Sequence, residues 1–499
     1  MTVVPRTEAA ATFFQPSVGF VGDVIPFVHG GRFHLFYLHE IRENAGSGTA
    51  WGLVVTDDFV VFEDLGPVLA SGGPHAADFN AYTGSVIADG ERLHMFYTGH
   101  NPARIGPDGV TPLQVVMHAV SGGDPSRWEK VPTDTFGAPE GYEPGDWRDP
   151  YVFRVPGEDQ WRMVLAARHD RGPSRRRGVI AQLRSSDLST WQVVQPFWDP
   201  RRYITHECPD VFEWNGWWYL VYSEFSESFT ARYRIARSPE GPWSVPERDT
   251  IDGRAFYAAK SVERDGRRFF VGWIATREGD VDDGPWQWAG TMSVLEAQQA
   301  DDGTLRFRMP PEVLRPFNEP LATSWHDAMS GRSLTEDELA AGTPNGYWAA
   351  VSDAAMPSAF ALRVDLELSE DTRECGVLLR SSSDGDTSYI IRLEPHRHRV
   401  VFDRWPRRRT GAMQWQISGD VPHVVELERS CPLPAGPHHL DVVVDDTACV
   451  VTVDESVVLS TRLYDRRAGH LGLFVGEGRA TFGNPTVSVR SETTRKEAQ

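Results

Sequence analysis

The chain repeats a short run of aromatic and aliphatic residues five times within its first 300 residues. Each run follows a turn sequence such as "HGG", "ADG" or "WNG", as the second strand of a β-hairpin does. Successive runs are 60, 68, 56 and 51 residues apart, close to the length of one blade of a β-propeller. The runs begin at Arg32, Arg92, Gln160, Gly216 and Arg267.

Further strand-like segments lie between these runs, for example "GLVVTDDFVVFED" and "QVVMHAVSG". No apolar stripe at helical spacing persists through any of them. Five hairpin-rich units therefore predict a five-bladed β-propeller over residues 12–318.

The pattern changes after the fifth unit. Residues 319–346 are polar, and their segment "SLTEDELAAG" is the one candidate for a helix, so they are predicted to be a linker. Short alternating strands return over residues 347–490 and predict a β-sandwich. Residues 491–499 form a polar tail. The predicted fold is all-β, a propeller followed by a sandwich.

Charge and cysteine content restrict the partners and the compartment. A formal net charge of −20 disfavours nucleic acids and anionic membranes as partners. The four cysteines are scattered, which favours a reducing compartment and no metal site. With no signal peptide and no apolar stretch near the ~20 residues of a membrane span, we expect a cytoplasmic protein without a cofactor. The sequence leaves a homo-oligomer open.

Polar residues stand at a similar place in successive units. Acidic residues precede four of the five runs by ten to about sixteen residues, and the second unit has hydroxyls there instead. Because the first strand of each blade lines the central channel, these side chains are expected to converge at one end of it. They are Asp23, Asp149, Glu207 and Asp252, with Thr83 and Ser85 in the second unit.

Converging carboxylates suit the cleavage of a glycosidic bond. One group protonates the leaving oxygen, and another attacks the anomeric carbon or activates water. A neighbouring carboxylate raises the pKa of the acid, and such acid catalysis contributes roughly 10²–10⁴ in rate. Taken one at a time, each acid is better interpreted as a turn or cap residue. Their shared offset is what favours catalysis.

Several motifs resemble those of glycoside hydrolase family 32, which includes invertases, inulinases, levanases and sucrose-6-phosphate hydrolases. "WRDP" at 147–150 is similar to the family's Arg-Asp-Pro motif, and "ECP" at 207–209 to its Glu-Cys-Pro motif. "YTGS" at 82–85, "DGRAFYAAK" at 252–260 and the Trp-Ala-Gly segment after residue 272 follow in the family's order. The resemblance covers about residues 15–490 and includes the sandwich.

The resemblance implies a retaining β-fructofuranosidase for a sucrose- or fructan-type saccharide. Asp23 would be the nucleophile, Asp149 the transition-state stabiliser and Glu207 the general acid/base. Independently of the resemblance, Cys208 has no nucleophile-base context and is interpreted as packing behind Glu207. The implied substrate-binding residues are Thr83, Ser85, Trp147, Arg148, Asp252, Tyr257 and Trp288.

The first motif departs from the family, which there reads Trp-Met-Asn-Asp-Pro-Asn-Gly. This chain has "VGFVGDVIPF", with Gly22 before Asp23. The change leaves three alternatives open: another furanoside such as an arabinofuranoside, transfer to a sugar acceptor, or a propeller that binds carbohydrate without catalysis. An inverting arabinosidase of the five-bladed type is a further alternative. The basic run at 168–178 either contacts an acidic sugar or is a solvated hairpin.

Overall fold

The computed structural model describes residues 7–406 and 426–491. It divides into two compact units. The first comprises residues 1–251, 256–273 and 288–305, and the second comprises residues 252–255, 274–287 and 306–499. Among the described residues, no helix has the length and apolar character needed to cross a membrane. Residues 492–499, most of the predicted tail, lie outside the described part of the chain.

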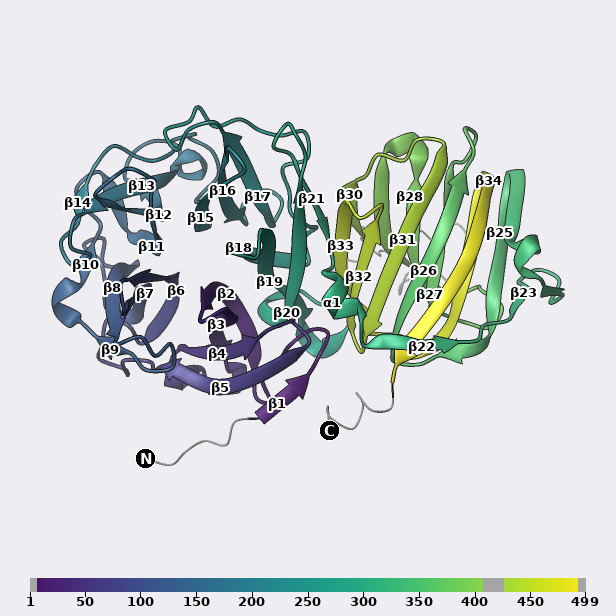
Figure 1. Ribbon diagram of the computed structural model, residues 1–499, viewed down its shortest axis with the longest axis horizontal. Helices are drawn as coiled ribbons and strands as arrows, with labels where there is room; N and C mark the ends of the chain where they lie inside the picture. The colour runs from purple at the N-terminus through teal and green to yellow at the C-terminus, as the bar shows by residue number, and fades with distance from the viewer. Residues whose placement is uncertain (1–6, 407–425, 492–499) are drawn as a thin grey trace. The chain divides into compact units, whose positions relative to one another are not determined.

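The predicted propeller is present, and its blades follow one another around a centre (Figure 1). Blade 1 contains β1 (Thr7–Ala10), β2 (Phe20–His29), β3 (Arg32–Glu40), β4 (Ala50–Thr56) and β5 (Val61–Leu69). Blade 2 contains β6 (Asn80–Asp89), β7 (Arg92–Ile105), β8 (Pro112–Ser121), β9 (Glu129–Lys130) and β10 (Phe136–Gly137). Blade 3 contains β11 (Tyr142–Arg154), β12 (Trp161–His169), β13 (Gly178–Ser185) and β14 (Gln192–Val193). Blade 4 contains β15 (Glu207–Trp214), β16 (Trp217–Glu224) and β17 (Thr230–Ala236). Blade 5 contains β18 (Phe256–Arg264), β19 (Arg267–Arg277), β20 (Trp286–Gln299) and β21 (Leu305–Arg308).

The five repeated runs form the second strand of each blade, namely β3, β7, β12, β16 and β19. Their aromatic and aliphatic side chains fill the spaces between neighbouring blades. Phe36 and Trp51 of blade 1, for example, share one buried cluster with Met95 and Tyr97 of blade 2. Burial of such surface stabilises the ring by about 25 cal/mol per Å² of apolar area.

The innermost strands β2, β6, β11, β15 and β18 contact one another in turn around the centre. In the first four of them, pairing with the second strand is interrupted by a register shift. In each of these strands one interruption contains a predicted site motif: Gly22–Asp23, Thr83, Asp149–Pro150 and Cys208–Pro209. The β11 strand has a second interruption, between Tyr142 and Trp147. A β-bulge redirects side chains and is common beside active sites.

Blade 1 and blade 5 are joined by pairing between β2 and β20, and the Met292 amide also donates a 2.8 Å hydrogen bond to the Phe14 carbonyl. Val21 of β2 pairs with Gly290 of β20, and this pair joins blade 1 to blade 5. The pair lies two residues before Asp23 and two residues after Trp288 in the sequence. The ring therefore closes beside the predicted nucleophile.

The second unit contains the β-sandwich. Its strands are β22 (Phe317–Leu321), β23 (Trp325–Asp327), β24 (Ser333–Leu334), β25 (Ala340–Met356), β26 (Ala359–Leu368), β27 (Glu374–Ser381), β28 (Ser388–Glu394), β29 (Arg399–Trp405), β30 (Leu427–Ser430), β31 (Gly436–Asp445), β32 (Ala448–Val453), β33 (Val457–Arg462) and β34 (Gly469–Arg490). The first half of β34 pairs with β25 and β27, and its second half pairs with β22 and β26. One strand thus runs through both layers of the sandwich.

Helical structure is confined to short segments, and it differs from the prediction over residues 333–342. That stretch is β24, a 3₁₀ turn η5 (Glu336–Leu339) and the start of β25, because residues 340–343 pair with β34 instead of continuing a helix. The single α-helix of the described chain is α1 (Pro311–Leu314). The other 3₁₀ turns are η1 (Arg42–Ser47), η2 (Pro132–Asp134), η3 (Ser174–Arg176), η4 (Glu278–Asp280) and η6 (Pro395–Arg397).

Candidate active site

A cavity of about 650 Å³ in the propeller receives side chains from all five blades. Three of the predicted carboxylates line it together, and aromatic residues contribute much of the remaining wall. The lining residues are Asp23, Leu38, Glu40, Tyr82, Gln114, Arg148, Asp149, Glu207, Phe225, Phe229, Tyr257 and Trp288. Cavities of this size with a few convergent polar groups are the usual form of a small-molecule site.

Asp23 is fixed by donors from three other blades. Its Oδ2 accepts a hydrogen bond of 2.6 Å from Thr83 Oγ1, and its Oδ1 accepts one of 3.0 Å from Trp273 Nε1. The Cys208 thiol approaches Oδ2 at 3.5 Å. Burial raises the pKa of Asp23, whereas the donors from Thr83 and Trp273 lower it. These donors favour the ionised carboxylate that a nucleophile requires.

Asp149 sits at the bulge of β11 with a left-handed backbone, at φ +58°. Its amide donates a 2.7 Å hydrogen bond to Thr98 Oγ1, and its Oδ2 accepts one of 2.8 Å from the amide of Cys208. Burial raises the pKa of Asp149 to about 6, and the neighbouring Asp23 adds to the effect. The left-handed residue breaks the alternation of the strand, so consecutive residues Arg148 and Asp149 both reach the cavity.

Glu207 is held between a cation and a hydroxyl. Arg148 Nη2 lies 3.1 Å from Oε1, and the Tyr257 hydroxyl donates a 2.6 Å hydrogen bond to Oε2. Burial raises the pKa of Glu207 and Asp149 raises it further, while Arg148 and Tyr257 lower it. Its side chain is 22% exposed, against 5% for Asp149. Glu207 is thus the more solvent-accessible of these two acids, as proton exchange with a leaving group or water requires.

The structure brings most of the predicted site residues together. Asp23, Arg148, Asp149, Glu207, Tyr257 and Trp288 line the cavity, and Thr83 stands directly behind Asp23. Trp288 is 38% exposed and offers a flat face to the cavity. Its ring lies over Gly22, where an added Cβ would come within 2.6 Å of the indole.

Three predicted substrate-binding residues lie elsewhere. Ser85 accepts a hydrogen bond from the Val152 amide and lines a different cavity of the propeller. Trp147 is fully buried in the core between blades 2 and 3, because the bulge follows it and it keeps the core-facing register. Asp252 belongs to the second unit, where its carboxylate accepts hydrogen bonds from the amide and hydroxyl of Ser460. We do not retain these three as substrate contacts.

Sequence reasoning missed several residues of the site. Trp273 belongs to the fifth aromatic run and reads as core, although its indole N–H binds Asp23. Glu40 ends the first repeated run and Gln114 lies in the strand-like segment after the second run, and neither belongs to a motif. Phe225 and Phe229 stand in the loop between β16 and β17, where an aromatic pair so close to a motif glutamate was the one available signal.

The basic run contains a hairpin whose charges are largely paired. Arg168 and Arg177 both contact Glu143, at 2.8 and 2.6 Å, and Arg176 contacts Glu227 at 2.6 Å. None of the residues 168–178 lines the cavity. This arrangement favours the solvated-hairpin interpretation of the run.

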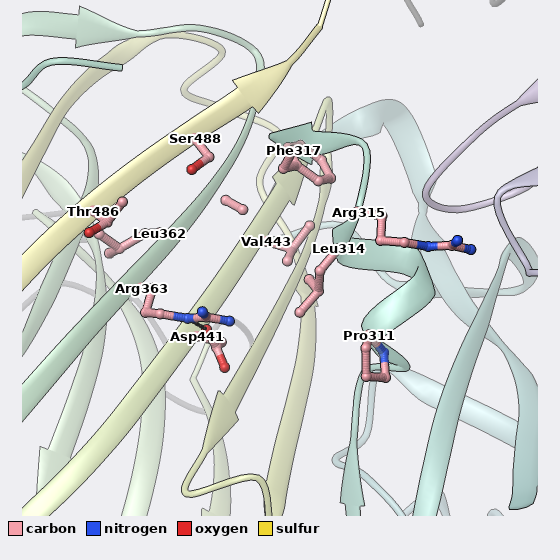
Figure 2. Close-up of a pocket in the computed structure, with 11 residues that line it drawn as sticks. Pro311, Leu314, Arg315, Phe317, Leu362, Arg363, Asp441, Val443, Thr486 and Ser488 are labelled. Atoms are coloured by element: carbon pink, nitrogen blue, oxygen red, sulfur yellow. Dashed lines mark hydrogen bonds and ion pairs between the residues drawn. The ribbon is translucent and has the colours of Figure 1, made fainter. Parts of the chain in front are cut away.

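The second unit has cavities of its own, and Figure 2 shows one of about 310 Å³. An Arg363–Asp441 ion pair of 3.1 Å and the hydroxyls of Thr486 and Ser488 stand along it (Figure 2). Its one aromatic lining residue, Phe317, is buried with Arg490 over its ring. It holds one carboxylate and no acid–base pair, so the propeller cavity is the better candidate for catalysis. Across residues 7–406 and 426–491, no group of three or more His, Cys, Asp or Glu side chains is placed to hold a metal ion.

A model of the glycosyl hydrolases family 32 N-terminal domain matches residues 13–308, more than half of the chain. The chain belongs to glycosyl hydrolase family 32. Membership in family 32 makes the protein a glycosidase and confirms the resemblance found in its motifs.

Relatives span most of this family 32 chain. A sucrose-6-phosphate hydrolase of Escherichia coli is 28% identical over 64% of this chain and 67% of its own length. A levanbiose-producing levanase of Bacillus subtilis is 22% identical over 97% of this chain and 91% of its own.

Solved structures confirm the fold. Fructan 1-exohydrolase IIa of Cichorium intybus superposes with a TM-score of 0.73 at 16% identity, covering 98% of this chain and 97% of its own. A family 32 β-fructofuranosidase of Bombyx mori gives 0.69 at 17% identity, covering 97% and 94%.

Proposed function

We propose that this family 32 glycosidase cleaves non-reducing-end β-fructofuranosyl linkages of sucrose- or fructan-type saccharides, with retention of configuration. The observation that carries the proposal is the placement of Asp23, Asp149 and Glu207 in one cavity with different partners. The names of the relatives, sucrose-6-phosphate hydrolase and levanase, support the substrate class.

The first step uses Asp23 and Glu207 together. The Asp23 carboxylate attacks the anomeric carbon, the bond from that carbon to the leaving oxygen breaks, and Glu207 transfers its proton to that oxygen. The raised pKa of Glu207 favours the protonated form that this step consumes. The product is a fructosyl ester on Asp23 and a free leaving sugar.

The second step reverses the roles. Glu207, now a carboxylate, takes a proton from water while the water oxygen attacks the anomeric carbon and the bond to Asp23 breaks. Asp149 stabilises the positive charge that develops on the sugar in both steps. It also accepts hydrogen bonds from the hydroxyls of that sugar. Arg148 and Tyr257 orient Glu207, and Trp288 stacks on the sugar face.

Reducing-sugar release from sucrose, inulin, levan and aryl furanosides tests the proposal. We expect wild type to hydrolyse fructosides. Asp23→Asn and Glu207→Gln should each lower that turnover by at least a thousandfold. Glu213→Gln is the matched control, because Glu213 is an exposed carboxylate on the same strand as Glu207. NMR of the first product formed reports retention or inversion.

Each alternative has its own outcome in this assay. The altered first motif, in which Trp288 covers Gly22, favours a second candidate, hydrolysis of another furanoside such as an arabinofuranoside. Products larger than the substrate would indicate fructosyl transfer, and inversion would indicate the inverting mechanism. Binding without turnover of any sugar would support a non-catalytic propeller, although the position of Asp23 in the cavity favours catalysis. A cytoplasmic location and self-association remain sequence predictions, which cell fractionation and light scattering measure.

A further inference from the structure

We propose that Glu40 makes the cavity selective for uncharged furanosides, so that the enzyme rejects saccharides that carry a phosphate. This inference rests on the proposed function and assigns a specificity-determining role to Glu40 at that same site. It sets this chain apart from relatives whose names specify a phosphorylated sugar.

Glu40 is the last residue of β3 and lines the cavity with the three catalytic-site carboxylates. Its backbone pairs with Phe20, three residues before Asp23. Burial raises the pKa of the Tyr82 hydroxyl, and the charges of Glu40 and Asp23 raise it further. Tyr82 therefore lies within electrostatic reach of both acids, which places Glu40 near the substrate-binding part of the cavity.

The Glu40 carboxylate forms no hydrogen bond or ion pair with any described residue. Its neighbouring basic side chains are those of Arg42 and His39. The Arg42 guanidinium stacks on the Phe20 ring at 3.9 Å and donates a 2.8 Å hydrogen bond to the Trp288 carbonyl. His39 Nε2 is 2.7 Å from the Val18 carbonyl. Neither neighbour is hydrogen-bonded to Glu40, so its acceptor oxygens remain available to sugar hydroxyls.

The charges lining the cavity are strongly unequal. Three carboxylates, those of Asp23, Glu40 and Asp149, face one guanidinium, that of Arg148, and the fourth acid, Glu207, holds its proton before the first step. Arg148 is already bound to Glu207 and, at 2.7 Å, to Asp146. A phosphate dianion entering this space would be repelled, and like charges in a partly desolvated cavity repel more strongly than in water.

Among residues 7–406 and 426–491, no cation besides Arg148 lines the cavity to receive a phosphate. Three arginines of the basic run at 168–178 are already in ion pairs. Arg168 and Arg177 pair with Glu143, and Arg176 pairs with Glu227. Hydroxyl groups of a neutral sugar, in contrast, can donate to carboxylates without a charge penalty. Charge therefore separates the two substrate classes.

The experiment compares kcat/KM for sucrose and sucrose 6-phosphate in three proteins: wild type, Glu40→Gln and Glu43→Gln. Glu43 provides the matched control, because it is an exposed carboxylate three residues away that does not line the cavity. We expect wild type to prefer sucrose by at least tenfold. Glu40→Gln should reduce that preference at least threefold, Glu43→Gln should not, and added salt should weaken the preference because it is electrostatic.

Equal or better hydrolysis of sucrose 6-phosphate by wild type would overturn the inference, as would an unchanged preference in Glu40→Gln. Hydrolysis of neither sugar, and of neither inulin nor levan, would contradict the proposed function instead, and titration calorimetry of sucrose and sucrose 6-phosphate with the same variants would then decide. A binding preference for sucrose that Glu40→Gln reduces would support the inference. Equal binding, or binding of neither sugar, would overturn it.

Discussion

The Tyr257 hydroxyl donates a 2.6 Å hydrogen bond to Oε2 of Glu207, the proposed general acid/base. The bond stabilises the Glu207 carboxylate and lowers its pKa against the effect of burial. Tyr257 itself is stacked on Phe229 at 4.1 Å between ring centroids. An aromatic pair at the cavity wall thereby fixes the orientation of the proposed acid/base.

Tyr257→Phe should raise the pKa of Glu207, since the lost hydroxyl stabilises the carboxylate more than the carboxylic acid. The alkaline limb of kcat/KM reports deprotonation of the acid, so it should move to higher pH. We expect kcat/KM at the optimum to fall roughly tenfold, as for loss of a hydrogen bond to a charged group. Tyr219→Phe is the control, because that hydroxyl binds the Gly303 carbonyl elsewhere in the propeller. An unchanged alkaline limb would contradict the assignment.

Asp149→Asn should stabilise the protein while removing activity. The pKa of Asp149 is about 6 in the folded protein, against 3.8 for an ordinary aspartate. Between these values the folded protein holds a proton that the unfolded chain releases, so ionising Asp149 costs stability as the pH rises. Over the full window this cost is on the order of 2–3 kcal/mol. The asparagine variant avoids it, so its free energy of unfolding should exceed that of wild type at pH 7.

Denaturant titrations at pH 3.5 and pH 7 check this prediction. The advantage of Asp149→Asn should be absent at pH 3.5, where the carboxyl is protonated in both states, and present at pH 7. An advantage of the same size at both pH values would mean that it comes from packing and not from the proton.

Gly22→Ala should disturb sugar binding through Trp288. The added Cβ would meet the indole at 2.6 Å, so the ring must move from its place in the wall. We expect KM to rise roughly threefold to tenfold, the range for loss of one aromatic stacking contact. Gly122→Ala, where no atom lies within 4 Å of the new Cβ, should change nothing. If Trp288 carries the effect, Gly22→Ala should be silent in a Trp288→Ala background.

Asp252→Ala should lower stability and leave catalysis nearly intact. The variant loses the hydrogen bonds from the Ser460 amide at 3.0 Å and from its hydroxyl at 2.6 Å. Unpaired buried donors cost about 1–3 kcal/mol in the free energy of unfolding. Ser460→Ala should destabilise in the same direction, and a double-mutant cycle measures the coupling. A hundredfold loss of kcat/KM with unchanged stability would instead return Asp252 to the substrate site.

The sequence predicted the propeller because each blade repeats one buried hairpin, and burial of Phe36 or Tyr222 imposes the same pattern each time. It predicted Asp23, Asp149 and Glu207 because all three precede that hairpin at a similar offset. It misplaced Trp147, because strand alternation puts residues 147 and 149 on one face, whereas the left-handed Asp149 breaks that alternation. The sequence did not predict Glu40 or Trp273 as site residues. Each lies in a repeated aromatic run that looks like an ordinary core strand, and the packing of its blade brings it to the site.

The donors to Asp23 come from blades 2, 4 and 5, and the strand pair Val21–Gly290, which helps to join blade 1 to blade 5, lies two residues away. The nucleophile is therefore assembled only when the first and last blades have met. Hydrolysis becomes a direct reporter of that event. During refolding, turnover should return in step with the joining of blades 1 and 5, and later than the hairpins of the individual blades.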